Sequence, residues 1–199
     1  MKEIPERTKK RFVLLLELLE RVEEKNITSV ELEKLTGFSS AVIRKDISYL
    51  NLILGKSNGY NVIQLKKALE DTINASGKKQ KCCIVGLGRF GQTLLENTEL
   101  ENTNYTLVAG FDSNVNRTEV LHSVFPLHPT TMLEKVIGQE EITFAILCVP
   151  PKEAQKVTDM LCKAGIKAIV NYTPCLLSVP KNVKVENVSL LTALKTLSL

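Results

Sequence analysis

The stretch KCCIVGLGRFGQTLL, residues 81–95, decides the fold of the larger part of this chain. A short apolar run predicts a buried strand, the glycine motif Gly86-Leu87-Gly88-Arg89-Phe90-Gly91 follows it, and a helical pattern follows the motif. This order of strand, GxGxxG and helix is what a dinucleotide-binding turn requires. Gly86 permits the tight turn, Gly88 leaves room for a pyrophosphate, and Gly91 lets the helix pack on the strand. The alternative interpretation is a glycine-rich turn that holds no ligand.

The segment that follows indicates which dinucleotide would bind. Asp112 comes 21 residues after Gly91, at the end of a second apolar run over 106–111. A carboxylate at this place accepts hydrogen bonds from the adenine ribose hydroxyls and repels a 2′-phosphate, so we expect NAD(H) rather than NADP(H). The candidate neighbours of the nicotinamide are Phe90, Tyr105, Val149 and Pro150.

Further strands and helices alternate after the glycine motif. Apolar runs predict strands at 142–149, 168–171 and 183–188, and helical patterns cover 92–98 and 153–164. Strands that are apolar throughout and alternate with helices are typical of a parallel sheet covered on both faces. We therefore expect an α/β, Rossmann-like domain over residues 80–199.

The chain before this domain has a different pattern. Apolar residues at helical spacing predict helices at 7–22, 30–35, 40–52 and 64–73. Ser29 is expected to cap the second helix, and Val42, Ile43, Ile47 and Leu50 are expected to face inward. The small, polar and basic run at 74–79 marks a boundary between a domain over 1–79 and the α/β domain.

Two of these helices, joined at Thr36-Gly37-Phe38-Ser39, have the form of a helix-turn-helix. In that unit the start of the second helix faces base edges in the major groove, where Arg44 and Lys45 could contact guanine. Ser39 and Ser40 suit phosphates, with help from the free amides at the helix start. Lys56 and Tyr60 would belong to a wing along the DNA backbone. The alternative is a small helical dimerisation or cap domain with an exposed basic face.

Charge supports a polyanionic partner for the first domain only. The net charge of +4 is confined to residues 1–79, which hold 15 Lys and Arg against 11 Asp and Glu, whereas residues 80–199 hold 11 of each. The five cysteines have apolar neighbours and form no CxxC pair, so we expect buried thiols in a reducing cytoplasm and no metal site. No apolar run is long enough to span a membrane.

Catalytic residues are not apparent in the sequence. The two histidines, His122 and His128, are weak candidates, with His128 expected in a loop before Pro129. Little sequence remains after Cys175 to form a substrate domain. We therefore expect a binding protein rather than an enzyme.

These residues together resemble the Rex family of redox-sensing transcriptional repressors over nearly the whole chain. The winged-helix part resembles the family at IPERT (4–8), Arg11, SVEL (29–32), IRKDISY (43–49) and GYNV (59–62). The resemblance adds Tyr49, at the end of the fourth of these motifs, to the expected DNA-binding residues. The second domain resembles it at GLGRFG (86–91), FD (111–112), VPPKEAQ (149–155) and GIKAIVNYTP (165–174). The resemblance implies an N-terminal winged-helix domain and an NAD(H)-binding domain. It also implies a homodimer that binds a palindromic operator and is released by NADH. A C-terminal helix at about 190–199 would insert between the domains of the partner chain.

Three departures from the family pattern leave alternatives open. The wing segment GKSNG (55–59) is short, and the family often has Arg where this chain has Glu17 and Asp where it has Ser189. In relatives those two positions couple the domains. A second hypothesis is therefore a DNA-binding paralogue whose dinucleotide is structural and whose redox response is weak. A third is a small NAD-dependent reductase with a helical cap.

Overall fold

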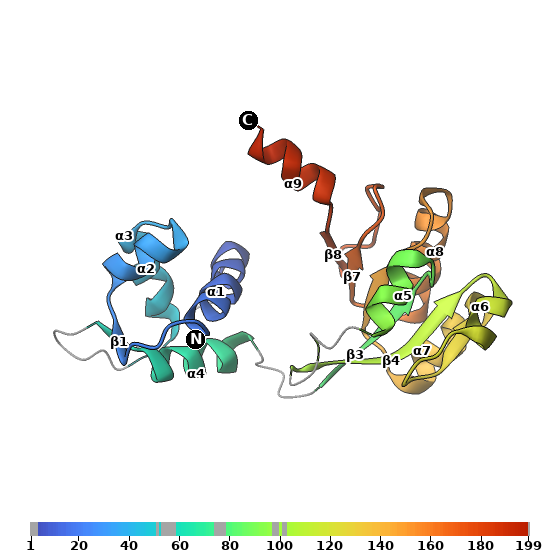
Figure 1. Ribbon diagram of the computed structural model, residues 1–199, viewed down its shortest axis with the longest axis horizontal. Coiled ribbons are helices and arrows are strands. Elements are labelled where there is room, and N and C mark those ends of the chain that lie inside the picture. The colour runs from blue at the N-terminus through green and yellow to red at the C-terminus, as the bar shows by residue number, and fades with distance from the viewer. Residues whose placement is uncertain are drawn as a thin grey trace. The chain divides into compact units, whose positions relative to one another are not determined.

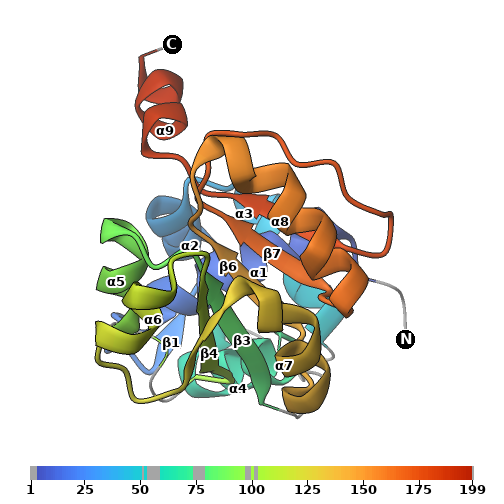
Figure 2. The same ribbon diagram turned by 90° about the vertical axis from the view of Figure 1, so that its right-hand side faces the viewer.

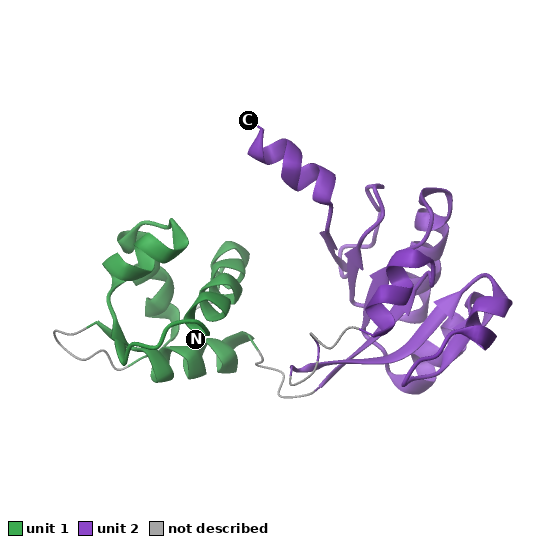
Figure 3. Cartoon of the chain, in the orientation of Figure 1, with its two compact units in different colours: residues 1–78 green, residues 79–199 purple. Residues whose placement is uncertain are grey.

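The computed structural model describes residues 4–50, 52, 59–73, 79–96, 100 and 103–198. The chain divides into two compact units, residues 1–78 and residues 79–199 (Figure 3). Unit 1 buries one apolar cluster and unit 2 buries two, one of them larger than the other.

Unit 1 is a small helical domain with a two-stranded antiparallel ribbon. Its helices are α1 (Glu6–Leu19), α2 (Ser29–Thr36), α3 (Ser40–Ile47), the 3-10 turn η1 (Ser48–Leu50) and α4 (Val62–Ile73). The ribbon pairs β1 (Asn26–Ile27) with β2 (Tyr60–Asn61). Every helix contributes at least one side chain to the core, whose largest fully buried members are Phe12, Leu19, Leu32, Ile47, Leu65 and Leu69.

Local details in unit 1 differ from the sequence prediction. The N-cap of α2 is Thr28 rather than Ser29, because Thr28 and Glu31 form a reciprocal capping box. Within this box the backbone N–H and hydroxyl of Thr28 lower the pKa of the Glu31 carboxyl. Val42 faces solvent with 37% exposure rather than the core, because α3 buries the side chains at 43, 46 and 47. Helix α4 begins at Val62, before the predicted start at residue 64.

Unit 2 contains, in its described residues, a parallel sheet of six strands. They are β3 (Gln80–Val85), β4 (Tyr105–Asp112), β5 (Leu127–Pro129), β6 (Phe144–Leu147), β7 (Ala168–Asn171) and β8 (Lys184–Asn187). Their order in space is β5-β4-β3-β6-β7-β8, the doubly wound order of dinucleotide-binding folds. Within unit 2, the first strand is β3, and β4 and β5 follow in order toward one edge of the sheet. The next strand, β6, then lies on the other side of β3. The direction of winding therefore reverses between β3 and β6.

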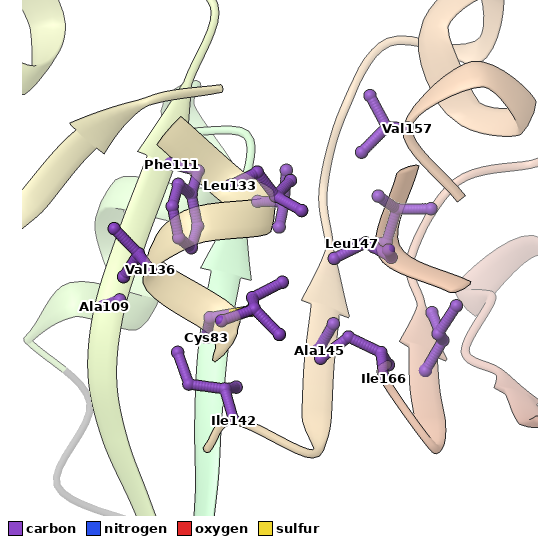
Figure 4. Packing of buried hydrophobic residues seen from close by; sticks show 14 of the residues in the cluster. Cys83, Ala109, Phe111, Leu133, Val136, Ile142, Ala145, Leu147, Val157 and Ile166 are labelled. Atoms are coloured by element: carbon purple, nitrogen blue, oxygen red, sulfur yellow. The ribbon is translucent and has the colours of Figure 1, made fainter. Parts of the chain in front are cut away.

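Helices lie on both sides of this sheet. Figure 2 shows α5 (Arg89–Leu95) and α6 (Val115–Val120) on one side of the strands and α7 (Leu133–Glu140) and α8 (Pro151–Ala164) on the other. The main core lies under α7 and α8, where Cys83, Phe111 and Leu147 are fully buried (Figure 4). On the opposite face of β6, Phe144 and Ile146 are only half-buried. The prediction of a sheet covered on both faces therefore does not hold fully at β6, where one face is only partly covered.

The segment between β4 and β6 contains elements that the sequence prediction lacks. They are α6, the short strand β5, the 3-10 turn η2 (Thr130–Met132) and α7. His128 lies in β5 rather than in a loop, with its ring 5.8 Å from that of Phe111. The last helix, α9 (Leu190–Leu197), projects away from the rest of unit 2 (Figure 1) and buries none of its side chains.

Candidate nucleotide and DNA sites

The glycine turn after β3 is shaped by how closely the backbone approaches itself. Gly86 has φ +97°, and a Cβ there would lie 2.7 Å from the carbonyl oxygen of Cys148. A Cβ on Gly91 would lie 1.9 Å from the carbonyl oxygen of Gly86. A Cβ on Gly88 would meet nothing within 4 Å. The folded chain thus needs glycine at 86 and 91, whereas Gly88 leaves open space beside the turn, which fits a ligand that approaches the backbone closely.

The predicted cofactor residues gather at the carboxyl edge of the sheet. Residues 86–91 follow β3, Asp112 ends β4, and Val149 and Pro150 follow β6. The amide of Cys148 donates to the carbonyl of Val85 over 2.8 Å, which ties the end of β6 to the end of β3. Ligands of doubly wound sheets bind outside the carboxyl ends of the strands where the winding reverses. The geometry therefore brings together the residues that the sequence proposed for the cofactor.

Asp112 is more deeply placed than the sequence suggests. Its side chain is buried, and its Oδ2 accepts a hydrogen bond of 2.7 Å from the backbone N–H of Leu87. Its Oδ1 accepts another of 2.7 Å from the N–H of Asn114, and an Arg117 nitrogen lies 3.3 Å from Oδ2. The carboxylate at the end of β4 thus braces the glycine turn. Oδ2 accepts bonds from both Leu87 and Arg117, so only Oδ1 keeps a lone pair that a ribose hydroxyl could use.

Aromatic residues distinguish the two edges of the sheet. The rings of Phe90, at the start of α5, and Tyr172, after β7, lie 4.6 Å apart at the carboxyl edge. Tyr105 begins β4 at the amino edge, where its ring packs edge-on against Phe144, the first residue of β6, at 5.4 Å. The expectation that Tyr105 neighbours the nicotinamide is wrong, because the strands are parallel and their amino ends lie away from the glycine turn. Tyr172, which the sequence analysis did not assign, occupies that edge instead.

The helix-turn-helix forms as expected, with a well-defined turn. Gly37 ends α2 in the left-handed conformation at φ +72°, and the Ser39 hydroxyl accepts from the N–H of Val42 at the start of α3. The Glu33 carboxylate accepts from the N–H of Ser40 at 3.0 Å. The amides of residues 40 and 42, which we expected to be free for phosphates, therefore already have partners inside the domain.

The exposed side of α3 carries the predicted basic residues. Its buried side contains Ile43, Asp46 and Ile47, so the opposite side presents Ala41, Arg44, Lys45 and Ser48 to solvent. Ser39 is exposed and Ser40 half-buried at the start of the helix. An Arg44 Nη1 donates to the hydroxyl of Ser29 over 2.9 Å, which orients the guanidinium toward the start of α2.

A buried ionic cluster holds α3 against α1. Both oxygens of Asp46 accept from the Arg11 guanidinium, at 2.5 and 2.8 Å, and Oδ1 also accepts from the Thr8 hydroxyl at 2.9 Å. Bonding to Asp46 raises the pKa of Arg11. Because Asp46 is buried within α3, this cluster fixes the orientation of the helix that exposes Arg44 and Lys45. Arg11 and Asp46 belong to motifs that resemble the family, but no local pattern in the sequence predicts that they form an ion pair.

Two predicted DNA contacts need revision. Tyr60 is only 9% exposed, because pairing with Ile27 turns its ring into the core, and burial raises its pKa. It is a core residue rather than an exposed wing contact. Tyr49 lies half-buried in η1 and also packs on the core. Lys56 lies outside the described residues.

The cysteine thiols, the candidate metal ligands and the hydropathy of the helices assign no further site among the described residues. Burial raises the pKa of Cys82 to about 11 and that of Cys148 to about 12, so both thiols stay protonated near neutral pH. Among the residues with described structure, no group of three or more His, Cys, Asp or Glu is arranged to hold a metal ion. The described helices include none long and apolar enough to cross a membrane.

Comparison with known proteins covers both units. Residues 3–48 match the family model described as putative DNA-binding protein N-terminus, and residues 77–175 match the CoA binding domain. The chain is 34% identical to the redox-sensing transcriptional repressor Rex of Limosilactobacillus reuteri over 98% of its own length and 92% of the relative's. It is 33% identical to Rex of Oenococcus oeni, over 98% and 91%. This chain belongs to the Rex family of redox-sensing transcriptional repressors.

Solved structures of the same family agree with the architecture. The crystal structure of RSP, a Rex-family repressor, has a TM-score of 0.87 at 30% identity, with 100% of this chain and 93% of RSP covered. RSP in complex with β-NAD⁺ and operator DNA has a TM-score of 0.84 at 32% identity, over 96% and 88%. The fold class and the family predicted from sequence are confirmed, and the family consists of repressors rather than enzymes.

The two positions where this chain departs from the family pattern are clearly placed. Glu17 is exposed on α1. Ser189 is the N-cap of α9, and its hydroxyl accepts from the N–H of Thr192 at 3.2 Å. Serine therefore performs the capping role that aspartate could also perform, but without a charge.

Proposed function

We propose that this chain is a cytoplasmic repressor that binds a palindromic operator as a homodimer and leaves it in the NADH-bound state. The observation that carries the proposal is that one chain combines a basic helix-turn-helix with a glycine turn open at Gly88. A relative of similar fold has been crystallised with β-NADH, and with β-NAD⁺ and operator DNA.

For the nucleotide, we assign the turn residues Gly86 to Gly91 to the pyrophosphate and Asp112 to the adenine ribose. The open space at Gly88 supports this assignment, because a side chain there would occupy the place of the phosphates. Val149 and Pro150 line the nicotinamide end. The nicotinamide rings of NAD⁺ and NADH differ in charge and shape, and the protein would sense this difference. It would not need to transfer a hydride.

For DNA, we assign direct base contact to Arg44 and Lys45 on the exposed side of α3, and phosphate contact to the side chains of Ser39 and Ser40. Arg44 is the stronger candidate for guanine, because its planar fork can bond N7 and O6 together. Two copies of α3 would have to stand about 34–36 Å apart to enter successive major grooves. A closed, NADH-bound dimer in which this spacing is wrong would release the operator.

The homodimer is supported by apolar surface in unit 2. Leu190, Leu191, Leu194 and Leu197 on α9 are 53–85% exposed. Exposed leucines at this density are costly unless another surface covers them. The half-buried Phe144 and Ile146 on the open face of β6 are a second apolar surface of the same unit. We propose that α9 packs between the domains of the partner chain.

Glu17 and Ser189 favour a second candidate, a DNA-binding paralogue that responds weakly to redox state. An opposite-charge pair at these positions would favour one domain arrangement, and this chain lacks it. In that case operator affinity would be equal with NAD⁺ and NADH. A small reductase, the third hypothesis, would instead consume NADH with a carbonyl substrate.

Fluorescence anisotropy of a labelled operator tests the proposal. Operator affinity is measured at fixed salt with no nucleotide, with NAD⁺ and with NADH, since phosphate contacts alone change affinity by orders of magnitude when salt varies. We expect NADH to weaken operator binding roughly 5–150-fold, the range of a typical coupling free energy. Unchanged affinity with saturating NADH contradicts release, and loss of NADH absorbance with carbonyl substrates would indicate an enzyme.

A further inference from the structure

Phe90 and Tyr172 form an exposed aromatic pair at the carboxyl edge of unit 2. The packing of the fold does not explain why these two rings are exposed. The rings of Phe90 and Tyr172 touch at 4.6 Å, yet the two residues remain 48% and 36% exposed. Core aromatics of this unit, such as Phe111, are fully buried. Exposed aromatic rings held together at a predicted ligand crevice are a common feature of stacking sites.

The pair lies across the reversal point of the sheet. Phe90 follows β3 and Tyr172 follows β7, with β6 between these two strands. The N–H of Tyr172 donates to the carbonyl of Leu147, the last residue of β6, at 3.0 Å. The two rings therefore meet across the carboxyl end of β6, at the edge where doubly wound folds bind their ligands.

The turn that carries Tyr172 is rigid. Its neighbour Asn171 is fully buried and donates both to the carbonyl of Cys175 and to the Asn187 side chain, each over 2.8 Å. The Asn171 Oδ1 accepts from the N–H and hydroxyl of Thr173 at 3.0 and 2.7 Å. Tyr172 is thus fixed from both sides, so it can hold the Phe90 ring in one place.

We propose that the Phe90–Tyr172 pair stacks on the nicotinamide and distinguishes its two redox states by charge, favouring the oxidised, cationic ring. This inference rests on the proposed function. Ring centroids 4.6 Å apart leave no space for a third ring between them, so the nicotinamide packs on an outer, exposed face of the pair. Aromatic faces attract cations, and the nicotinamide is cationic in NAD⁺ but neutral in NADH.

The aromatic pair would change the NADH/NAD⁺ ratio to which the repressor responds. With an aliphatic residue at position 90, the contribution of the ring face to NAD⁺ binding would be absent while most apolar contact with NADH would remain. The aromatic pair therefore raises the NADH/NAD⁺ ratio at which this repressor leaves its operator.

Calorimetric titration with three ligands tests the inference. NAD⁺, NADH and ADP-ribose, which lacks the nicotinamide, are each titrated into the full chain and into Phe90→Leu and Tyr172→Leu. Tyr105→Leu is the matched control, since it also replaces a partly exposed, paired aromatic residue of unit 2, but at the amino edge. Thermal unfolding of each variant confirms that the domain is folded.

We expect Phe90→Leu to weaken NAD⁺ binding about 2- to 30-fold more than NADH binding, the span of a cation–π contact. ADP-ribose should bind all variants equally, and Tyr105→Leu should change none of the three affinities. Equal changes for NAD⁺ and NADH, or an equal loss for ADP-ribose, would overturn the inference and leave the nucleotide site intact. If the unaltered chain binds none of the three ligands, the proposed function itself is wrong.

Discussion

On the exposed side of α3 in unit 1, side chains carry the proposed recognition, whereas at the carboxyl edge of unit 2 the decisive residues are glycines. Arg44 and Lys45 act through the atoms they present, and Asp46 acts through the bonds it makes to Arg11 and Thr8. Gly86, Gly88 and Gly91 act through the atoms they lack. Shortening a side chain should therefore damage the site on α3, whereas adding a side chain should damage the glycine turn.

The largest expected effect comes from adding one carbon at Gly91. In Gly91→Ala the new Cβ would lie 1.9 Å from the carbonyl oxygen of Gly86, so β3 and α5 must separate. We expect unit 2 to lose more than about 3 kcal/mol of unfolding free energy, beyond ordinary overpacking, because the contact is with backbone. Urea unfolding followed by circular dichroism measures the loss.

Gly88→Ala is the matched control for this substitution. Its Cβ meets nothing within 4 Å, so the unfolding free energy should stay within about 0.5–1 kcal/mol of the original. NADH affinity should nevertheless fall roughly tenfold or more, because the methyl group crowds the pyrophosphate. Normal NADH binding by Gly88→Ala would contradict the assignment of the turn.

Truncation of Asp46 should cause the next largest effect. Asp46→Ala leaves Arg11 and Thr8 without their buried partner, and we expect unit 1 to lose about 3 kcal/mol. This is the low end for a broken buried ion pair, because the Arg11 side chain is 26% exposed. Operator binding should weaken while NADH affinity, which belongs to unit 2, should not change. An equal loss of NADH affinity would contradict the expectation that this cluster supports the structure of unit 1 alone.

A smaller effect is expected from Arg44→Ala. If Arg44 reads a base, the substitution costs about 1–3 kcal/mol of operator binding and relaxes specificity at one position. Ser29→Ala serves as the control, because it removes only the hydroxyl that Arg44 bonds in the free protein. Anisotropy with a set of single-base operator variants measures both affinity and specificity. Unchanged specificity would indicate that Arg44 contacts a phosphate rather than a base.

The smallest expected effect concerns coupling between the units. Glu17→Arg combined with Ser189→Asp introduces the charge pair that the family often has, and aspartate still caps α9. We expect NADH-driven release of the operator to become about 2- to 5-fold stronger, the gain of a partly exposed ion pair. Each single variant is the control, since neither completes the pair. If the double variant responds as the original chain does, these positions do not set the redox response here.

How much of this could be predicted from the sequence depended on how local the signal was. The glycine turn was predictable because strand, turn and helix are adjacent, and α3 was predictable because its apolar residues repeat at helical spacing. The β5 strand has only three residues at the sheet edge and gives no periodic pattern. Thr28 and Ser29 can each cap a helix, and only the position of Glu31 decides between them.

The parts that failed depend on long-range contacts. Tyr60 has an exposed-looking polar context, but pairing with Ile27, far away in sequence, turns its ring into the core. The role of Asp112 follows from its contact with Leu87 across the neighbouring strands β4 and β3, and that of Tyr172 from its contact with Phe90 across the end of β6. No local pattern contains these contacts, since they arise only when the sheet is assembled.

The central claim is that the reduced dinucleotide in unit 2 and the operator on unit 1 oppose each other. Linkage requires the effect to be reciprocal, so NADH affinity measured with and without saturating operator tests it most directly. At fixed salt, we predict that the operator-bound protein binds NADH roughly 5–150-fold more weakly than the free protein. Equal NADH affinity in the two states would contradict the account.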